Sequence, residues 1–456
     1  MIRKLIALFA CAVVVLGLAV SGQSTASAEN TTAPTSVTGT QTIVVEGFDW
    51  GPAVTKTIVT LDQQISADSV TAESFAVLES KETFNWAALG DPSQDPTVHT
   101  VLDAPRTVLA AYTCDADGQA TGDSNQIALE LRFSPDEGSP YIYDFIIGHN
   151  SFCNPYNLQI TLTADAALTT ADGCSVAELT VDPSLDASKV ICSQLENVDL
   201  SGTFTGTDGK TLAYGSFVPA DDGQKHPLVI WLHGAGEGGT DPSVVALGNK
   251  VTALYGEEFQ TVMGGAYVLT PQTPTFWMAY NEEGAWNDNP GVSSIYQKTL
   301  MELIENYVQS NPNIDANRIY IGGCSNGGYM TMDLILNYPD YFAAAFPICE
   351  AYADAGITDE QLKGIQNLPV WFVYAKNDTT VVPESYEIPT IARLQSMGAD
   401  IHTSVFDDVH DTTGLYTGQD GSAYQYMGHW SWLYFFNNEC EDDGVNMWQW
   451  LTEQSK

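Results

Sequence analysis

A serine between two glycines stands where an apolar run gives way to a helical pattern. Residues 323–327 read Gly-Cys-Ser-Asn-Gly, which matches G-x-S-x-G with Ser325 at the centre, and they follow the strand-like segment 318–321. A helical stretch then continues to about residue 338. In this context the glycines let strand and helix backbones approach closely, and the serine hydroxyl stands above the sheet at the positive end of the helix. The pattern predicts that Ser325 is the nucleophile of an acyl-transfer reaction.

Acyl transfer also requires hydrogen-bond donors for the developing oxyanion. The backbone amide of Asn326 is one candidate, and a second is expected in the loop after an earlier strand. Residues 232–239 read Leu-His-Gly-Ala-Gly-Glu-Gly-Gly and follow an apolar run, so we expect Ala235 to supply this donor. A tight turn of structural value only is the alternative. We expect His233 to orient the loop and not to act as the general base.

A carboxylate must follow the serine in the chain, in a loop at the end of a later strand. Asp378 lies in such a loop, directly after the strand-like segment 370–374. We expect it to hold one tautomer of a histidine and to stabilise the imidazolium that forms. Glu350, which follows the strand-like segment 345–349, is the alternative acid.

Two histidines compete for the role of general base. His410 comes soon after the strand-like segment 401–406, so its place relative to the sheet favours it. His429 comes later and precedes a helix-like stretch. The residues alone leave this choice open.

Four segments taken together carry a family resemblance: residues 232–236, 323–330, 338–344 and 428–432. They resemble secreted bacterial esterases of the α/β-hydrolase type that are related to polyhydroxybutyrate depolymerases and feruloyl esterases. The resemblance covers residues 199–456 well and the first half only loosely. It implies carboxylic-ester hydrolysis, and it favours His429, which stands in the matching Gly-His-Trp-Ser-Trp motif. It leaves the ester open, whether polysaccharide-linked, a polyester or a small soluble ester.

The resulting hypothesis is a Ser325-Asp378-His429 triad that works through an acyl-enzyme intermediate and needs neither a metal nor an organic cofactor. A prolyl-oligopeptidase-like serine peptidase is one alternative. A surface-binding protein with a vestigial hydrolase domain is another. Trp277 and Trp286 fall in loops at the expected active face, where they would stack on a substrate, although packing within the core explains such aromatic residues equally well.

The patterns around these residues divide the chain into two domains. Residues 41–198 contain short β-type runs separated by Asp, Gly, Ser and Pro, which predicts a β-sandwich. The resemblance implies that this sandwich is immunoglobulin-like. Residues 199–456 alternate between strand and helix patterns, which predicts an α/β domain with a largely parallel sheet. The polar residues 29–40 are expected to form a linker.

The first 28 residues predict a secretory signal peptide, with basic residues, an apolar stretch and a small-residue cleavage site in that order. No later segment is apolar for long enough to span a bilayer, so we expect a secreted protein without a membrane span. The formal net charge of −41 disfavours nucleic-acid partners.

Export also predicts disulfide bonds among the cysteines. Four cysteines lie in the expected sandwich, where three pairings are possible. In the α/β domain, Cys324 could pair with Cys349 or with Cys440. Two buried free thiols are the alternative there.

Overall fold

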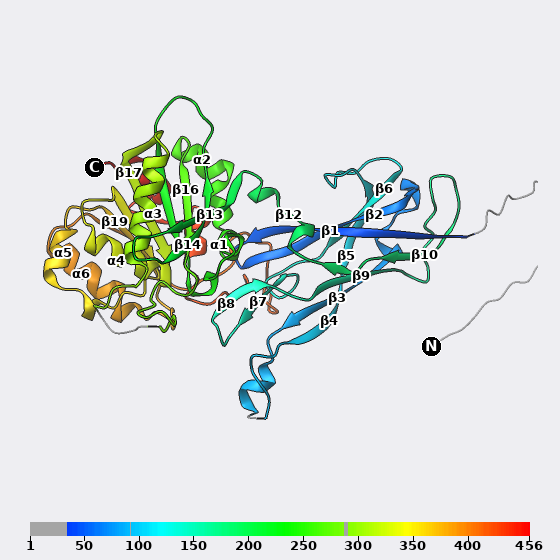
Figure 1. Ribbon diagram of the computed structural model, residues 1–456, viewed down its shortest axis with the longest axis horizontal. Coiled ribbons are helices and arrows are strands. Elements are labelled where there is room, and N and C mark those ends of the chain that lie inside the picture. The colour runs from blue at the N-terminus through cyan, green and yellow to red at the C-terminus, as the bar shows by residue number, and fades with distance from the viewer. Residues whose placement is uncertain (1–33, 92, 287–290) are drawn as a thin grey trace, which may run out of the picture.

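The computed structural model describes residues 34–91, 93–286 and 291–456. Within these residues the chain forms a β-sandwich followed by an α/β region, which lie side by side in Figure 1, the sandwich from blue to green and the α/β region from green to red. The predicted signal peptide lies outside the described residues. The predicted fold class is confirmed for both halves of the chain.

The sandwich consists of two sheets with one core between them. The first sheet has the strand order β10-β1-β2-β6-β5, with β12 paired to β1, and the second has the order β11-β9-β3-β4. Side chains of β1 alternate between buried and accessible, as expected for a strand with one face on a core. The strands are β1 (Thr35–Phe48), β2 (Gly51–Ile65), β3 (Phe75–Thr83), β4 (Thr100–Arg106), β5 (Val108–Cys114), β6 (Ser124–Leu131), β9 (Tyr156–Leu162), β10 (Val176–Val181), β11 (Ser184–Leu185) and β12 (Val190–Ile191).

Two features of the first half differ from the sequence expectations. Residues 35–40, expected within a linker, belong to β1, because their backbone pairs with both β10 and β2. The four cysteines of this region, expected in disulfide bonds, are free thiols, and so are Cys324, Cys349 and Cys440. No disulfide bond therefore joins any of the cysteines in the described residues.

The α/β region is built on a sheet with the order β13-β14-β16-β15-β17-β18-β19-β20. The pairs β13–β14 and β14–β16 are antiparallel, and every later pair is parallel. All seven residues of β15 are buried, as expected for a central strand with both faces covered. The strands are β13 (Val198–Thr205), β14 (Thr211–Phe217), β15 (His226–Leu232), β16 (Tyr267–Gln272), β17 (Ile314–Cys324), β18 (Ala344–Ile348), β19 (Val370–Ala375) and β20 (Ile401–Phe406).

Helices cover both faces of this sheet. Apolar residues of α3 to α6 join the core on one face, and those of α1, α2, α7 and α8 join the core on the other. The helix before β17 is α3. No helix among the described residues is long and apolar enough to cross a membrane. The helices are α1 (Pro242–Gly248), α2 (Glu257–Met263), α3 (Gln297–Ser310), α4 (Asn326–Asn337), α5 (Asp359–Gly364), α6 (Glu387–Ser396), α7 (Trp432–Phe436) and α8 (Met447–Glu453).

A polar contact fastens the sandwich to the α/β region. Asp49, which follows β1 and is almost fully buried, lies 2.8 Å from the ammonium of Lys250 and accepts a hydrogen bond of 3.1 Å from the side-chain amide of Asn437. Lys250 also donates to the side-chain oxygen of Asn437. One buried carboxylate of the sandwich thus binds two distant parts of the α/β region.

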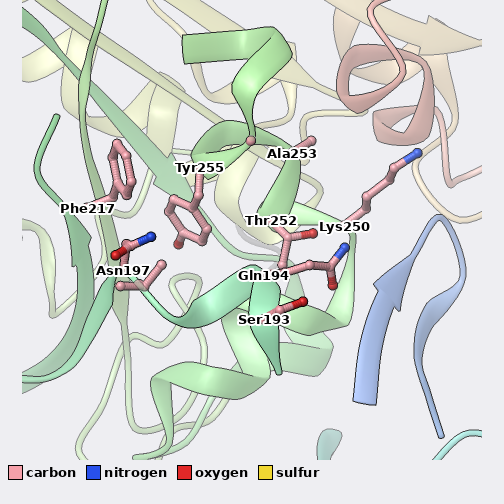
Figure 2. A pocket seen from close by; sticks show the side chains of 10 residues that line it. Ser193, Gln194, Asn197, Phe217, Lys250, Thr252, Ala253 and Tyr255 are labelled. Carbon is pink, nitrogen blue, oxygen red and sulfur yellow. The ribbon is translucent and has the colours of Figure 1, made fainter. Parts of the chain in front are cut away.

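A pocket of about 320 Å³ lies beside this contact, between the segment that leads into β13 and the α/β region. Figure 2 shows Gln194 and Asn197 of that segment facing Tyr255 and Lys250. None of the predicted catalytic residues lines this pocket, so it is separate from the candidate active site.

Candidate active site

Ser325 occupies a strained turn between β17 and α4. Its backbone angles are φ 55° and ψ −114°, a conformation that is costly for a residue with a side chain. The flanking glycines are required by packing, because a Cβ atom on Gly323 or Gly327 would lie 2.4 Å or 1.9 Å from the carbonyl oxygen of Leu232 in β15. The strain aims a partly accessible hydroxyl away from the sheet at the N-terminal end of α4.

Asp378 and His429 form a buried pair. The imidazole Nδ1 of His429 lies 2.7 Å from Oδ2 of Asp378, and the other carboxylate oxygen accepts hydrogen bonds from the backbone amides of Thr380 and Val381. A carboxylate at Nδ1 makes this nitrogen the proton donor and leaves Nε2 free to accept a proton. In the described residues no hydrogen bond joins the Ser325 hydroxyl to this imidazole.

A glycine before the histidine permits this approach. A Cβ atom on Gly428 would lie 2.3 Å from the side-chain oxygen of Asn377 and 2.6 Å from its backbone oxygen. The loop that carries His429 therefore packs against the loop that carries Asp378. The Gly-His pair of the family motif has a steric explanation in this contact.

His410 lies in a different environment. Its Nδ1 is 2.6 Å from the carboxylate of Asp408, two residues earlier, and its side chain is 41% exposed. Its backbone amide donates to the hydroxyl of Tyr434. Of the two candidate bases, the structure places His429 on Asp378 and pairs His410 with a local surface carboxylate.

The alternative acid, Glu350, is fully buried behind the strained turn that carries Ser325. It accepts a hydrogen bond from the backbone amide of Tyr352, and burial raises the pKa of its carboxyl to about 8. Burial also raises the pKa of the neighbouring Glu387. A carboxyl with a pKa of about 8 is largely protonated at neutral pH and is poorly suited to stabilise an imidazolium.

The two expected oxyanion donors lie at the ends of two strands. Asn326 is the first residue of α4, and Ala235 begins the short 3-10 helix η6 (Ala235–Glu237) after β15. Neither backbone amide has a hydrogen-bond partner among the described residues. Ala235 is partly accessible, whereas Asn326 is fully buried at the start of α4.

His233 fixes the loop that carries Ala235. Its Nδ1 lies 2.6 Å from the carbonyl oxygen of Gly234, and its Nε2 accepts from the backbone amide of Thr273. Burial lowers the pKa of this imidazole to about 3, so the ring is neutral, with Nδ1 as donor. The neutral ring makes a hydrogen bond at each of its two nitrogens and so orients the loop, which is the role expected from the sequence.

The sandwich packs directly against this same loop through the hairpin of β7 (Tyr141–Asp144) and β8 (His149–Phe152), which lies at the junction in Figure 1. The side-chain amide of Asn150 donates to the carboxylate of Glu237 at 3.4 Å. A Cβ atom on Gly236 would lie 2.8 Å from that amide, and one on Gly238 would lie 2.5 Å from the ring of His149. The glycines predicted to serve the oxyanion loop therefore also make room for the other domain.

The two tryptophans expected at the substrate differ in position. Trp277 is fully buried, its backbone amide donates to the side-chain oxygen of Asn326, and its ring packs on His233 with 5.1 Å between centroids. Trp277 is thus part of the core that supports the Ser325 turn, and its ring is not accessible to a ligand from solvent. Trp286 is 42% exposed and packs edge-on against Phe276. No group of three or more potential metal ligands occurs among the described residues.

Comparisons with known proteins agree with this geometry. Residues 40–177 match the esterase Ig-like N-terminal domain, and residues 214–414 match the phospholipase/carboxylesterase family. The fold resembles that of a solved thermostable esterase, with a TM-score of 0.66 and 23% identity, over 92% of this chain and all of that one. The second half of the chain has the α/β-hydrolase fold, and residues 214–414 are similar to carboxylesterases. The Ig-like match falls within the sandwich, and the carboxylesterase match ends before His429.

Two curated relatives are similar over part of the hydrolase. Feruloyl esterase B of Neurospora crassa is 28% identical over 161 residues, which are 35% of this chain and 50% of the relative. Poly(3-hydroxyalkanoate) depolymerase C of Paucimonas lemoignei is 26% identical over 154 residues, which are 31% of this chain and 32% of the relative. The matched segments thus span half or less of these relatives.

Proposed function

We propose that this hydrolase cleaves carboxylic esters with Ser325 as nucleophile, His429 as general base and Asp378 as the orienting acid. The observation that carries the proposal is the strained Ser325 turn at the N-terminal end of α4. Strain of this kind persists where the surrounding packing enforces it, and at this turn it presents a hydroxyl. The buried Asp378–His429 pair and the matching carboxylesterase family support the proposal.

In the first half of the reaction, Nε2 of His429 takes the hydroxyl proton as Ser325 attacks the ester carbonyl. Asp378 stabilises the resulting imidazolium through Nδ1 without taking the proton itself. The negative charge on the carbonyl oxygen is held by the free amides of Ala235 and Asn326. His429 then gives the proton to the departing alcohol, which leaves the acyl group on Ser325.

In the second half, His429 takes a proton from water as the water attacks the acyl-enzyme. The same amides stabilise the second tetrahedral oxyanion, and the proton returns to Ser325 as the acid departs. These steps use only groups of the chain and water.

The direct test is Ser325→Ala. We expect it to lower kcat/KM on p-nitrophenyl acetate by several orders of magnitude and to abolish labelling by a fluorophosphonate probe, with unchanged circular dichroism. A variant that keeps more than about a tenth of the wild-type rate would remove Ser325 from this role. Parallel assays on prolyl and aminoacyl p-nitroanilides test the peptidase alternative, which would gain if amide turnover equalled ester turnover.

The substrate class that fits best is an uncharged ester of a hydrophobic acid. One relative is named a feruloyl esterase and the other a polyhydroxyalkanoate depolymerase, and both names describe esters of this kind. Turnover of methyl ferulate and of hydroxybutyrate oligomers by the same preparation would decide between an aromatic and an aliphatic acyl group.

We also propose that the protein is secreted. The proposal rests on the pattern of the first 28 residues, with basic, apolar and small-residue segments in that order. N-terminal sequencing of protein recovered from the culture medium should find a new terminus near residue 29, and recovery only of intact chain inside the cell would contradict it.

A further inference from the structure

One unexplained surface feature is an apolar area on the Ig-like domain. Five large apolar side chains lie there, each between 45% and 58% exposed: Trp86, Leu89, Phe145, Ile146 and Ile147. Trp86 and Leu89 belong to the short helix η3 (Trp86–Gly90), and the other three form the turn of the β7–β8 hairpin. We call these five residues the ledge. Exposed apolar groups gathered in this way mark interaction surfaces more often than chance contacts.

Ring contacts make the ledge continuous. The centroids of Trp86 and Phe145 are 4.3 Å apart, and both rings contact Phe84 beneath them, at 5.2 Å and 5.4 Å. Phe84 is buried, so the exposed rings rest on the domain core. The two aromatic rings of the ledge therefore form one supported surface, which the neighbouring residues Leu89, Ile146 and Ile147 flank in sequence.

The hairpin turn is held in the conformation that exposes its apolar residues. One oxygen of Asp144 accepts hydrogen bonds from the backbone amides of Ile146 and Ile147, at 2.7 Å and 3.2 Å. Its other oxygen lies 3.2 Å from the imidazole of His99, which directly precedes β4. These contacts fix the backbone of residues 145–147 in the turn. The backbone of the turn therefore loses little conformational entropy when a partner binds to its exposed side chains.

The ledge leads to the oxyanion loop. Tyr143, which is 37% exposed on β7, packs on Phe145 with 4.7 Å between centroids. The ring of Tyr143 also lies 3.6 Å from the position of a Cβ atom on Gly236, the residue after Ala235. An apolar path thus runs from Trp86 through Phe145 and Tyr143 to the loop that would hold the oxyanion.

We propose that the ledge is a docking surface for the uncharged chain of a water-insoluble polyester, whose scissile ester lies at Ser325. An occupant that touches both the ledge and the oxyanion loop must be extended, because two domains contribute to the path. It must also carry no negative charge, since Asp91 and Asp95 follow η3 and the whole chain has a formal charge of −41. The inference rests on the proposed function, which supplies the chemistry at Ser325.

The test uses full-length protein and particles of poly(3-hydroxybutyrate). Binding is measured on the Ser325→Ala background, so that it does not depend on turnover. Trp86→Ser/Ile147→Ser removes the two most exposed side chains of the ledge. Leu109→Ser, a similarly exposed residue on β5 of the other sheet, is the matched control.

On the Ser325→Ala background, we expect the double variant to bind particles at least tenfold more weakly. With Ser325 in place, we expect the double variant to release soluble product from particles correspondingly slowly. Its hydrolysis of p-nitrophenyl acetate should stay within twofold of wild type. The control should match wild type in every assay. Thermal unfolding of each variant establishes that the fold is retained, and Ile147→Ser alone provides a milder variant if the double variant unfolds.

Three results would overturn the proposal. Unchanged particle binding by the double variant, or no particle binding by the parent, would show that the ledge does not dock polyester. A parallel loss of p-nitrophenyl acetate turnover would show a structural role. An oligomer that the double variant dissociates, seen by light scattering, would make the ledge a subunit interface. Failure of the proposed function is distinct, because wild type would then turn over neither ester.

Discussion

His429 and His410 each contact a carboxylate, but only one of these carboxylates is suited to catalysis. Asp378 is buried and fixed by two backbone amides, whereas Asp408 is close in the chain to its histidine and substantially exposed. A buried, oriented carboxylate stabilises an imidazolium far more effectively than an exposed one, because solvent screens the latter.

We therefore expect His429→Ala to lower kcat/KM about as much as Ser325→Ala, by several orders of magnitude, since members of a triad act together. His410→Ala should stay within about threefold of wild type. Steady-state assays on one soluble ester compare both variants with Ser325→Ala. An inactive His410→Ala together with an active His429→Ala would reverse the assignment.

Glu350 gives a prediction about stability. Its pKa of about 8 in the folded state exceeds the ordinary value of 4.5, so the folded protein binds more protons than the unfolded chain between these pH values. The free energy of unfolding must then fall as pH rises through this window. Glu350→Gln removes this titration and keeps an oxygen for the amide of Tyr352.

At pH 8.5 we expect Glu350→Gln to be more stable than wild type by about 1–3 kcal/mol, with no gain at pH 4.5. Denaturant unfolding at the two pH values measures this difference. The exposed Glu360→Gln is the control. A gain of equal size at both pH values would show that the carboxyl does not titrate in this window.

The residue types were sufficient to predict the turn that carries Ser325, because a G-x-S-x-G pattern between a strand and a helix is typical of a nucleophilic serine. They could not separate His410 from His429, since both follow the last strand of the sheet, β20. What separates them is the approach of two loops 51 residues apart, which Gly428 permits. Such a contact has no local pattern, and the family resemblance was needed to favour His429.

At the level of elements, the β7–β8 hairpin and the oxyanion loop form one unit across two domains. Asn150 braces Glu237 at the end of η6, two residues after the expected donor Ala235. The hairpin contains no catalytic side chain, so nothing in its own sequence signalled a role at the site. Strand patterns predicted the sandwich, but the contact depends on how two domains pack.

We expect Asn150→Ala to lower kcat about tenfold and to leave KM within about twofold, because oxyanion donors act mainly in the transition state. Asn157→Ala on β9 serves as the control for loss of an asparagine in this domain. Kinetics on p-nitrophenyl acetate give kcat and KM separately. If KM rose and kcat stayed constant, the hairpin would act on substrate binding instead of on the loop.

At the scale of the molecule, the two domains are expected to be interdependent. All three proposed catalytic residues lie beyond residue 198, which on the sequence alone favoured an active, separate C-terminal domain. The structure adds the hairpin contact and the buried Asp49–Lys250 pair between the domains. Removal of the sandwich would expose the glycine-rich loop to water and remove the carboxylate that pairs with Lys250.

A chain that begins at Val198 should therefore be at least tenfold less active on small soluble esters than the full-length protein, and less stable to heat. Activity and thermal unfolding of the two purified proteins test this. Full activity of the shorter chain would show that the hairpin contact contributes nothing to the oxyanion loop.

The Asp49 contact also bears on the order in which the protein is assembled. Asn437, which binds Asp49, is 388 residues further along the chain and is therefore synthesised long after it. The sandwich can complete its own sheets long before this residue exists, with Asp49 still hydrated. We expect each domain to fold first and the docking of the two to follow as a separate, late step. The docking of the two domains, and not the folding of either one, would then decide when the enzyme becomes active.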